Sequence, residues 1–317
     1  MKALTAILLL FWTTSSDQAE LRNVSGKVTI MPGIATENLR IFPLTYSGSH
    51  KSFTPFSQAL DKGWIVVSEK NEGEVNTILV KNKGNSTVFV MAGEVVKGAK
   101  QDRMIENDML IPPKSDWLEV ACYCTEHGRW SGTTKQFAEA DINVSPSVRA
   151  NARKEKDQSK VWEKVAENQE DILGAQSSTG AFRHIYEDKG YQTNRDNYYT
   201  KLKDLPEDNS SIKGVVVCVG EDILCVDLFG SNELLNHLWP KLLESYIVEA
   251  MRYYSKEDEG SVSLSEAKRF LGAYAEVDVK DEFTPGSGDL YEIQSRDAAG
   301  SALLSEGSLV HSDLFPD

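Results

Sequence analysis

From about residue 24 to residue 120, short apolar runs alternate with polar turns, which is the pattern of a β-rich segment. The runs are rich in β-branched and aromatic residues and are separated by Gly, Pro, Asn or Ser. The polar segment 82–86 is typical of a turn, so the runs on either side of it are predicted to form a hairpin. We expect strands at residues 27–31, 39–44, 64–67, 77–80, 87–91 and 117–121.

The pattern changes at Ser145, which precedes Pro146 and so indicates the start of a helix. The chain that follows is highly charged, and polar helical pieces are predicted as far as residue 199. Because candidate core residues are few here, we expect this third of the chain to cover the sheet. The first helix has only a narrow apolar stripe, made by Val161, Trp162 and Val165.

The last third combines strand and helix patterns. Residues 214–229 predict a β-hairpin, and residues 233–254 predict a long helix in which Pro240 marks a kink or a restart. Ser263 and Glu266 have the spacing of a capping box that opens a short helix. Strand-like pieces follow at residues 290–293, 302–304 and 308–310.

Strand runs and helix runs are segregated rather than alternating, which indicates the α+β class. We expect an N-terminal antiparallel β-rich part, a helical middle, and a C-terminal β-hairpin plus long helix, packed as one composite unit. The predicted divisions are a signal peptide at 1–19, a β-rich subdomain at 20–144, a charged helical cover at 145–210 and an α+β subdomain at 211–317.

The N-terminus has the pattern of an export signal. Lys2 precedes an apolar run over residues 3–12, which is too short to span a bilayer, and a cleavage point is plausible after Ala19. We therefore expect a secreted or periplasmic protein of bacterial origin. No later stretch has the pattern of a membrane span.

Composition narrows the classes of partner. The chain has 317 residues, of which 40% are hydrophobic and 26% charged, as in a globular protein. Its formal net charge of −14 argues against nucleic-acid binding, since an acidic surface repels a phosphate backbone. A small anionic ligand would need a local basic pocket, and the oligomeric state stays open.

The four cysteines are too few for a disulfide-built scaffold. Cys122 and Cys124 lie two apart on one predicted strand and so share a face. Cys218 and Cys225 would lie opposite each other in the predicted hairpin. They could form a cross-strand disulfide in an oxidising compartment, or pack as two core thiols.

A first candidate block spans residues 93–103 and directly follows a predicted strand. Lys97, Lys100 and Arg103 make it locally positive, and Glu94 could act as an acid or a base if burial raised its pKa. The Gly-Lys-Ser/Thr ending of a phosphate-binding Walker loop is missing. The alternative is a bulged hairpin in which Glu94 pairs with Arg103.

A second candidate block spans residues 126–130. Arg129 could bind an anion, Trp130 could stack a planar group, and Glu126 or His127 could transfer a proton. The alternative is an ion pair under a tryptophan lid. The five histidines are scattered, so no metal site is predicted, and no cofactor either.

Several short motifs, taken in order, resemble the ARG and rhodanese-phosphatase-superfamily-associated protein domain family, an uncharacterised and mostly prokaryotic family. The resemblance spans nearly all of the chain after the apolar N-terminus, and it implies proximity to ADP-ribose or phosphate chemistry. This sequence departs from the pattern at Cys122, Tyr123 and His127. The matching motifs are residues 93–103, Cys124-x-Glu126-x-Gly128-Arg129-Trp130, Gln158 with Val161-Trp162 and Val165, Val226-Asp227-Leu228-Phe229, residues 238–243, and Leu309-Val310-His311 with Phe315-Pro316.

These observations predict one composite site for an anionic, phosphate- or ADP-ribose-like small molecule. Arg103 and Arg129 would hold the charged group and Trp130 would stack, with Lys97 and Gln101 as further ligand contacts. Glu94 and Glu126 are the candidate catalytic residues. The alternatives are a hydrolase of a phosphorylated or glycosylated small molecule with a Glu general base, and a structural envelope protein without a ligand.

Overall fold

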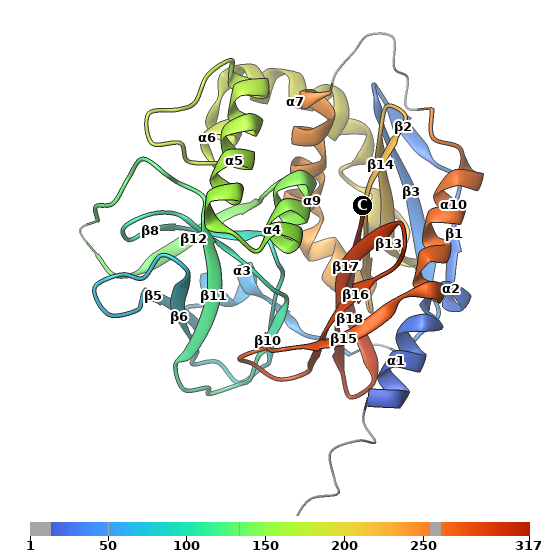
Figure 1. Cartoon of the computed structure of the whole chain (residues 1–317), viewed down its shortest axis with the longest axis horizontal. Coiled ribbons are helices and arrows are strands. Elements are labelled where there is room, and N and C mark those ends of the chain that lie inside the picture. Colours follow the sequence, from blue (N-terminus) through green and yellow to red (C-terminus); the bar gives the residue numbers. More distant parts are fainter. Residues whose placement is uncertain (1–13, 50, 133, 254–260) are drawn as a thin grey trace, which may run out of the picture.

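The computed structural model describes residues 14–49, 51–132, 134–253 and 261–317, and it has an α+β fold (Figure 1). A small β-barrel and a large antiparallel sheet lie on either side of the long helix α9 (Asn232–Arg252). Among the described residues, no helix is both long enough and apolar enough to cross a membrane.

The barrel is an antiparallel sheet that closes on itself. Its edge strands meet at an isolated bridge between Ser68 and Gln136, and the Glu69 N–H donates to the Lys135 carbonyl at 2.8 Å. The strands lie in the order β12 (Phe137–Asn143), β8 (Glu94–Gly98), β9 (Arg103–Ile105), β11 (Leu118–Cys124), β6 (Thr77–Asn82) and β5 (Ile65–Glu69).

The predicted hairpin across residues 82–86 is wrong. Strand β6 pairs with β5 and β11 in the barrel, whereas β7 (Val88–Val90) leaves it and pairs with β10 (Met109–Ile111) and β4 (Thr54–Pro55). Burial gives the physical reason. Every second residue of β6 is buried, as in a barrel wall, but all three residues of β7 are buried, so it must be covered on both faces. Helix α3 (Phe56–Asp61) packs beside it.

The large sheet combines the two ends of the chain. Its central hairpin is confirmed, and strands from the N-terminal segment join it directly. Beginning at one edge, the order is β1 (Val28–Ile30), β3 (Leu39–Tyr46), β13 (Ile212–Val219), β14 (Asp222–Phe229), β18 (Ser308–Pro316), β17 (Ala298–Ser305), β16 (Asp289–Gln294) and β15 (Asp278–Glu282), with β2 (Ile34–Thr36) also paired to β3.

Helices cover both faces of this sheet. Helix α9 is continuous through Pro240, so the predicted restart is wrong, and it packs between the sheet and the barrel. The opposite face is covered by α1 (Thr14–Arg22), α2 (Val24–Lys27), α10 (Leu264–Leu271) and the 3-10 helix η1 (Gly272–Glu276). The capping box of Ser263 and Glu266 at the start of α10 is confirmed.

The charged middle segment contributes more to the core than the sequence predicts. Val148, Val161, Phe182 and Tyr191 are buried in the same cluster as α9. The prediction failed because each short helix buries only a few residues, and several of these are large aromatics. The helices are α4 (Pro146–Glu155), α5 (Gln158–Leu173), α6 (His184–Glu187), α7 (Lys189–Leu202) and α8 (Leu205–Asp208).

All four cysteines are free and buried, so the disulfide alternative is wrong and the core-thiol alternative is confirmed. The pairing of β13 with β14 shifts register between Val217 and Cys218, which places Cys218 opposite Ile223. Cys218 therefore faces the core under α10, whereas Cys225 faces the core under α9. Two thiols on opposite faces of a sheet cannot bond.

The expected end of the signal peptide, at residue 19, falls within α1. Leu21 of this helix is fully buried, and the Tyr291 hydroxyl donates to the Asp17 carboxylate at 2.7 Å. The apolar N-terminal run, residues 3–12, lies outside the described residues.

Candidate functional site

The two sequence blocks meet at one end of the barrel. Strands β8 and β9 form a hairpin in which Val96 lies opposite Arg103, and β11 lies on the other side with Cys124 opposite Arg103. The second block follows β11 directly. Arg103 is thus held between strands that carry both blocks.

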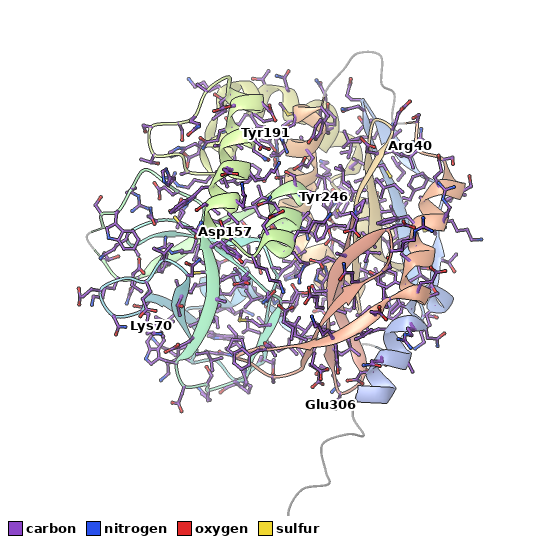
Figure 2. All side chains as sticks on the ribbon, in the orientation of Figure 1. Arg40, Lys70, Asp157, Tyr191, Tyr246 and Glu306 are labelled. Carbon is purple, nitrogen blue, oxygen red and sulfur yellow. The ribbon has the colours of Figure 1, made fainter. Side chains whose placement is uncertain are left out.

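The alternation of side chains along the strands shows which groups point into the barrel. Val67, Ile105 and Cys122 belong to the barrel core, so the residues two positions along on the same strands, Glu69 and Arg103, continue the inward rows at one end. Arg103 is fully buried and Glu69 nearly so. Figure 2 labels Lys70, which follows Glu69, at the outer side of the barrel. We call Glu69, Lys100, Arg103 and Trp130 the barrel mouth.

The guanidinium of Arg103 is only partly satisfied. Its Nη1 donates to the Gln101 carbonyl at 3.0 Å and to Gln101 Oε1 at 3.4 Å, whereas Nε and Nη2 have no hydrogen-bond partner among the described residues. Arg103 Nη2 lies 3.9 Å from Glu69 Oε1, which accepts from the Lys100 N–H at 3.1 Å. Glu69 Oε2 is also buried without a described partner. Such groups are costly when buried, so an occupant that completes them would be stabilised.

Trp130 lies over these cations. The Lys100 Nζ is 4.9 Å from the centre of the indole ring, and the Arg103 Cζ is 5.8 Å away. The indole remains 48% exposed. Gly132 fixes the path of residues 130–132, which we call the Trp130 segment, because a Cβ on Gly132 would lie 2.0 Å from the Ala99 carbonyl oxygen. The segment therefore packs directly on the first block and separates Arg103 from solvent.

Arg129 braces this arrangement, with all of its N–H groups engaged. Its Nε donates to Glu126 Oε1 at 2.9 Å, and Nη1 donates to the carbonyls of Ala99 and Ser131, each at 2.8 Å. Its Nη2 pairs with Glu126 Oε2 at 2.5 Å and with Asp102 Oδ1 at 3.2 Å. No donor remains for a ligand. The ion pair that the sequence left as an alternative is therefore present between Arg129 and Glu126, whereas Trp130 covers Lys100 and Arg103.

Glu126 is ionised and fully engaged. Its burial works against the charged form, but hydrogen bonds from Arg129 and from the Asp102 N–H outweigh burial and lower the pKa of this carboxyl. A carboxylate with a lowered pKa and both oxygens occupied is a poor proton donor and a weak base.

Three residues at this end of the barrel were missed from the sequence: Glu69, Asp102 and Arg183. Arg183 Nε donates to Asp102 Oδ2 at 2.8 Å, which links α6 to the first block. Burial and the neighbouring charge of Glu126 raise the pKa of Asp102. Glu69 could have been found, since it follows Ile65 and Val67 at alternate positions of one strand. No local pattern points to Arg183.

Other predicted site residues lie around the mouth with different roles. Gln101 donates from Nε2 to the Glu126 carbonyl at 2.8 Å and accepts from the Cys124 thiol at 3.0 Å. Burial raises the pKa of that thiol. Lys97 is exposed and points out of the barrel, since its neighbour Val96 points in. His127 packs edge-on against Trp162, with ring centres 4.4 Å apart.

Glu94 lies at the opposite end of β8 from the mouth. Its Oε1 forms an ion pair with Lys241 of α9 and its Oε2 accepts from the Met91 N–H at 2.7 Å, so the alternative pairing with Arg103 is wrong. Lys241 also approaches Glu139 of β12, with Nζ 3.6 Å from Oε1. Burial raises the pKa of Glu139 to about 7; Lys241 opposes this shift and Glu94 adds to it.

A fully buried charged chain joins the barrel to the large sheet. His311 Nδ1 lies 2.6 Å from Asp108 Oδ2, and its Nε2 lies 3.4 Å from Asp227 Oδ1. Arg149 donates to both oxygens of Asp227, and the Tyr246 hydroxyl donates to Asp227 Oδ2 at 2.5 Å. Figure 2 shows Tyr246 near the centre of the molecule. Burial opposes protonation of His311, but the two aspartates outweigh burial and raise its pKa to about 10.

Four hollows lined by described residues lie away from the mouth. One of about 550 Å³ is bordered by Pro146, Gly220, Glu249 and Phe315, and three others lie near α10 and α7. Among the described residues, no group of three or more His, Cys, Asp and Glu side chains could hold a metal ion.

The family comparison matches nearly the whole described fold. The ARG and Rhodanese-Phosphatase-superfamily-associated Protein domain matches residues 27–315. This chain belongs to that family. No curated protein and no solved structure matches it. In this family member, the motif residues cluster at the barrel mouth, at the Lys241 ion pair and along the chain through Asp227 and His311.

Proposed function

We propose that the protein binds a small anionic molecule at the barrel mouth. The charged group would lie against Arg103 and Lys100, and a planar group of the same molecule would stack on Trp130. One observation carries the proposal: a fully buried guanidinium with two unpartnered nitrogens, Nε and Nη2, lies beneath a half-exposed indole. The mouths of β-barrels are common places for ligand sites.

Binding rather than turnover is the activity that the geometry supports. Glu94 and Glu126, the candidate general bases, each have both carboxylate oxygens engaged. Arg129 supports the site indirectly, since it ties the Trp130 segment to Asp102 and to the Ala99 carbonyl.

Access to Arg103 requires the Trp130 segment to move, because the guanidinium is fully covered. Binding of a ligand should therefore change the environment of Trp130. The net charge of −14 keeps most of the surface unattractive to anions, so binding should be confined to this local cationic group.

Calorimetric titration with phenyl phosphate and with inorganic phosphate, at pH 5.5, tests the proposal. We expect Lys100→Ala to weaken the binding of both ligands, and Trp130→Ala to weaken the binding of phenyl phosphate about tenfold through the lost stacking contact. Trp117→Ala is the matched control, since Trp117 has a similar exposure of 45% and belongs to neither block. Absence of binding by both ligands, or equal effects of the two tryptophan variants, would contradict the proposal.

We also propose that the protein is exported, on the basis of the apolar N-terminal run. N-terminal sequencing of the protein from its native cells tests this. Removal of a segment ending at or near residue 19 supports export, and an N-terminus that retains residues 3–12 contradicts it.

A further inference from the structure

We infer that the barrel mouth selects an oxyanion that still carries a proton, such as a protonated phosphate group, and that Glu69 is the residue that makes this selection. The inference rests on the proposed function, because it concerns the charged end of the ligand at the same site.

The hydrogen-bond donor of this site is the free edge of Arg103. A guanidinium presents Nε–H and one Nη2–H side by side, in the fork geometry that binds two oxygens of one oxyanion. In this structure Nη1 is occupied by Gln101, whereas Nε and Nη2 are both buried and unpartnered. The available edge therefore fits two oxygens of one tetrahedral or planar anion.

The acceptor side is Glu69. Its Oε1 receives the Lys100 N–H and lies 3.9 Å from Arg103 Nη2, so the carboxylate borders the free edge of the guanidinium. Its Oε2 is a buried acceptor without a described partner. An anion that binds the fork must lie beside this carboxylate.

Together, Arg103 and Glu69 favour a ligand that both accepts and donates hydrogen bonds. A fully deprotonated anion would meet a second negative charge and leave Glu69 Oε2 without a donor, which is costly in a buried site. An oxyanion with one O–H can accept from Arg103 and donate to Glu69. Inorganic phosphate keeps a proton at neutral pH, phosphate monoesters lose theirs near pH 6, and sulfate carries none.

Other nearby acceptors do not replace Glu69 in this role. Gln101 Oε1 already accepts from the Cys124 thiol and from Arg103, and Glu126 is bound to Arg129. Asp102 is occupied by Arg129 and Arg183. Among the described carboxylates in contact with the mouth, Glu69 is the one with an oxygen available.

Calorimetric titration with phosphate and with sulfate, at pH 7 and equal ionic strength, tests the inference on the full chain. We expect the wild-type protein to bind phosphate about tenfold or more tightly than sulfate, as for one hydrogen bond to a charged group. Glu69→Gln should bring the two affinities close together, because the amide can donate to sulfate. Equal affinities in the wild-type protein would overturn the inference and leave the proposed function standing.

A second measurement needs no variant. The affinity for phenyl phosphate should fall as the pH rises from 5.5 to 7.5 and the ester loses its last proton, while the affinity for sulfate stays nearly constant over the same range. A phenyl phosphate affinity that rises or stays level would overturn the inference. Failure of phosphate, phenyl phosphate and sulfate all to bind would overturn the proposed function itself.

Discussion

Arg149 and Asp227 form a bidentate ion pair in the interior of the protein, with both hydrogen bonds at 2.8 Å. Arg149 comes from α4 in the charged middle segment, and Asp227 comes from the central hairpin of the large sheet. The same aspartate contacts His311, which in turn reaches Asp108 near the barrel. One chain of alternating charges thus joins three parts of the fold.

This chain of charges should be essential for stability. We expect Asp227→Asn to lower the free energy of unfolding by about 3–5 kcal/mol, because it leaves Arg149 and His311 with uncompensated buried charge. Urea unfolding followed by circular dichroism measures the effect. Lys135→Ala, which removes an exposed ion pair with Glu72, is the control and should leave the midpoint nearly unchanged. An equally small effect of the two variants would contradict the view that this buried chain of charges is essential for stability.

His311 should be an imidazolium at pH 8. Its folded pKa of about 10 lies above the ordinary value of 6.5, so the stabilisation that it provides is complete below pH 6.5 and is lost as the pH rises through about 10. Nitrogen NMR of labelled histidine reports the protonation state directly. A neutral ring at pH 8 would show that the two aspartates do not hold the proton.

Glu139 should give a pH dependence of the same sign, but at lower pH. Its folded pKa of about 7 lies above that of an unfolded glutamate, so the folded state loses stability relative to the unfolded state as the pH rises from about 4 to 7. We expect Glu139→Gln to be about 1 kcal/mol more stable than the wild-type protein at pH 8 and to lose this advantage at pH 4. Unfolding midpoints of the variant and the wild-type protein at pH 4 and pH 8 test this. A difference between the two proteins that is the same at both pH values would count against a raised pKa of Glu139.

The cysteines should stay reduced even if the protein is exported. Cys218 and Cys225 face different cores, so air oxidation of the folded protein should not join them. Mass spectrometry after alkylation in denaturant should find four modified thiols, and dithiothreitol should not shift the unfolding temperature. Two protected cysteines in the unreduced protein would contradict the register of this hairpin.

Local signals in the sequence predicted local structure well. The hairpin of β13 and β14, helix α9 and the capping box of Ser263 all depend on residues close together in the chain, and all are present. The barrel was not foreseen, because its closure depends on Ser68 meeting Gln136. A one-residue register shift likewise determines which face of the sheet Cys218 lies on, and no turn residue in the sequence predicts this shift.

The candidate site shows the same division. The sequence placed Arg103, Arg129 and Trp130 in neighbouring segments, and the structure brings these segments together. The sequence could not assign ion-pair partners that lie far apart in the chain, such as Lys241 for Glu94 or Arg183 for Asp102. Those partners determine which cations are already neutralised. They leave Arg103 available and Arg129 occupied, although the two residues are alike in the sequence.

The side-chain Nε–H resonances of Arg103 and Arg129 give the most direct test of anion binding at the barrel mouth. Arg103 Nε–H is unpartnered and Arg129 Nε–H is bound to Glu126, so each residue serves as the control for the other. On titration with inorganic phosphate, we expect a saturable shift of the Arg103 signal, assigned by its loss in Arg103→Lys, and little change at Arg129. A stationary Arg103 signal, or a shift confined to Arg129, would contradict it.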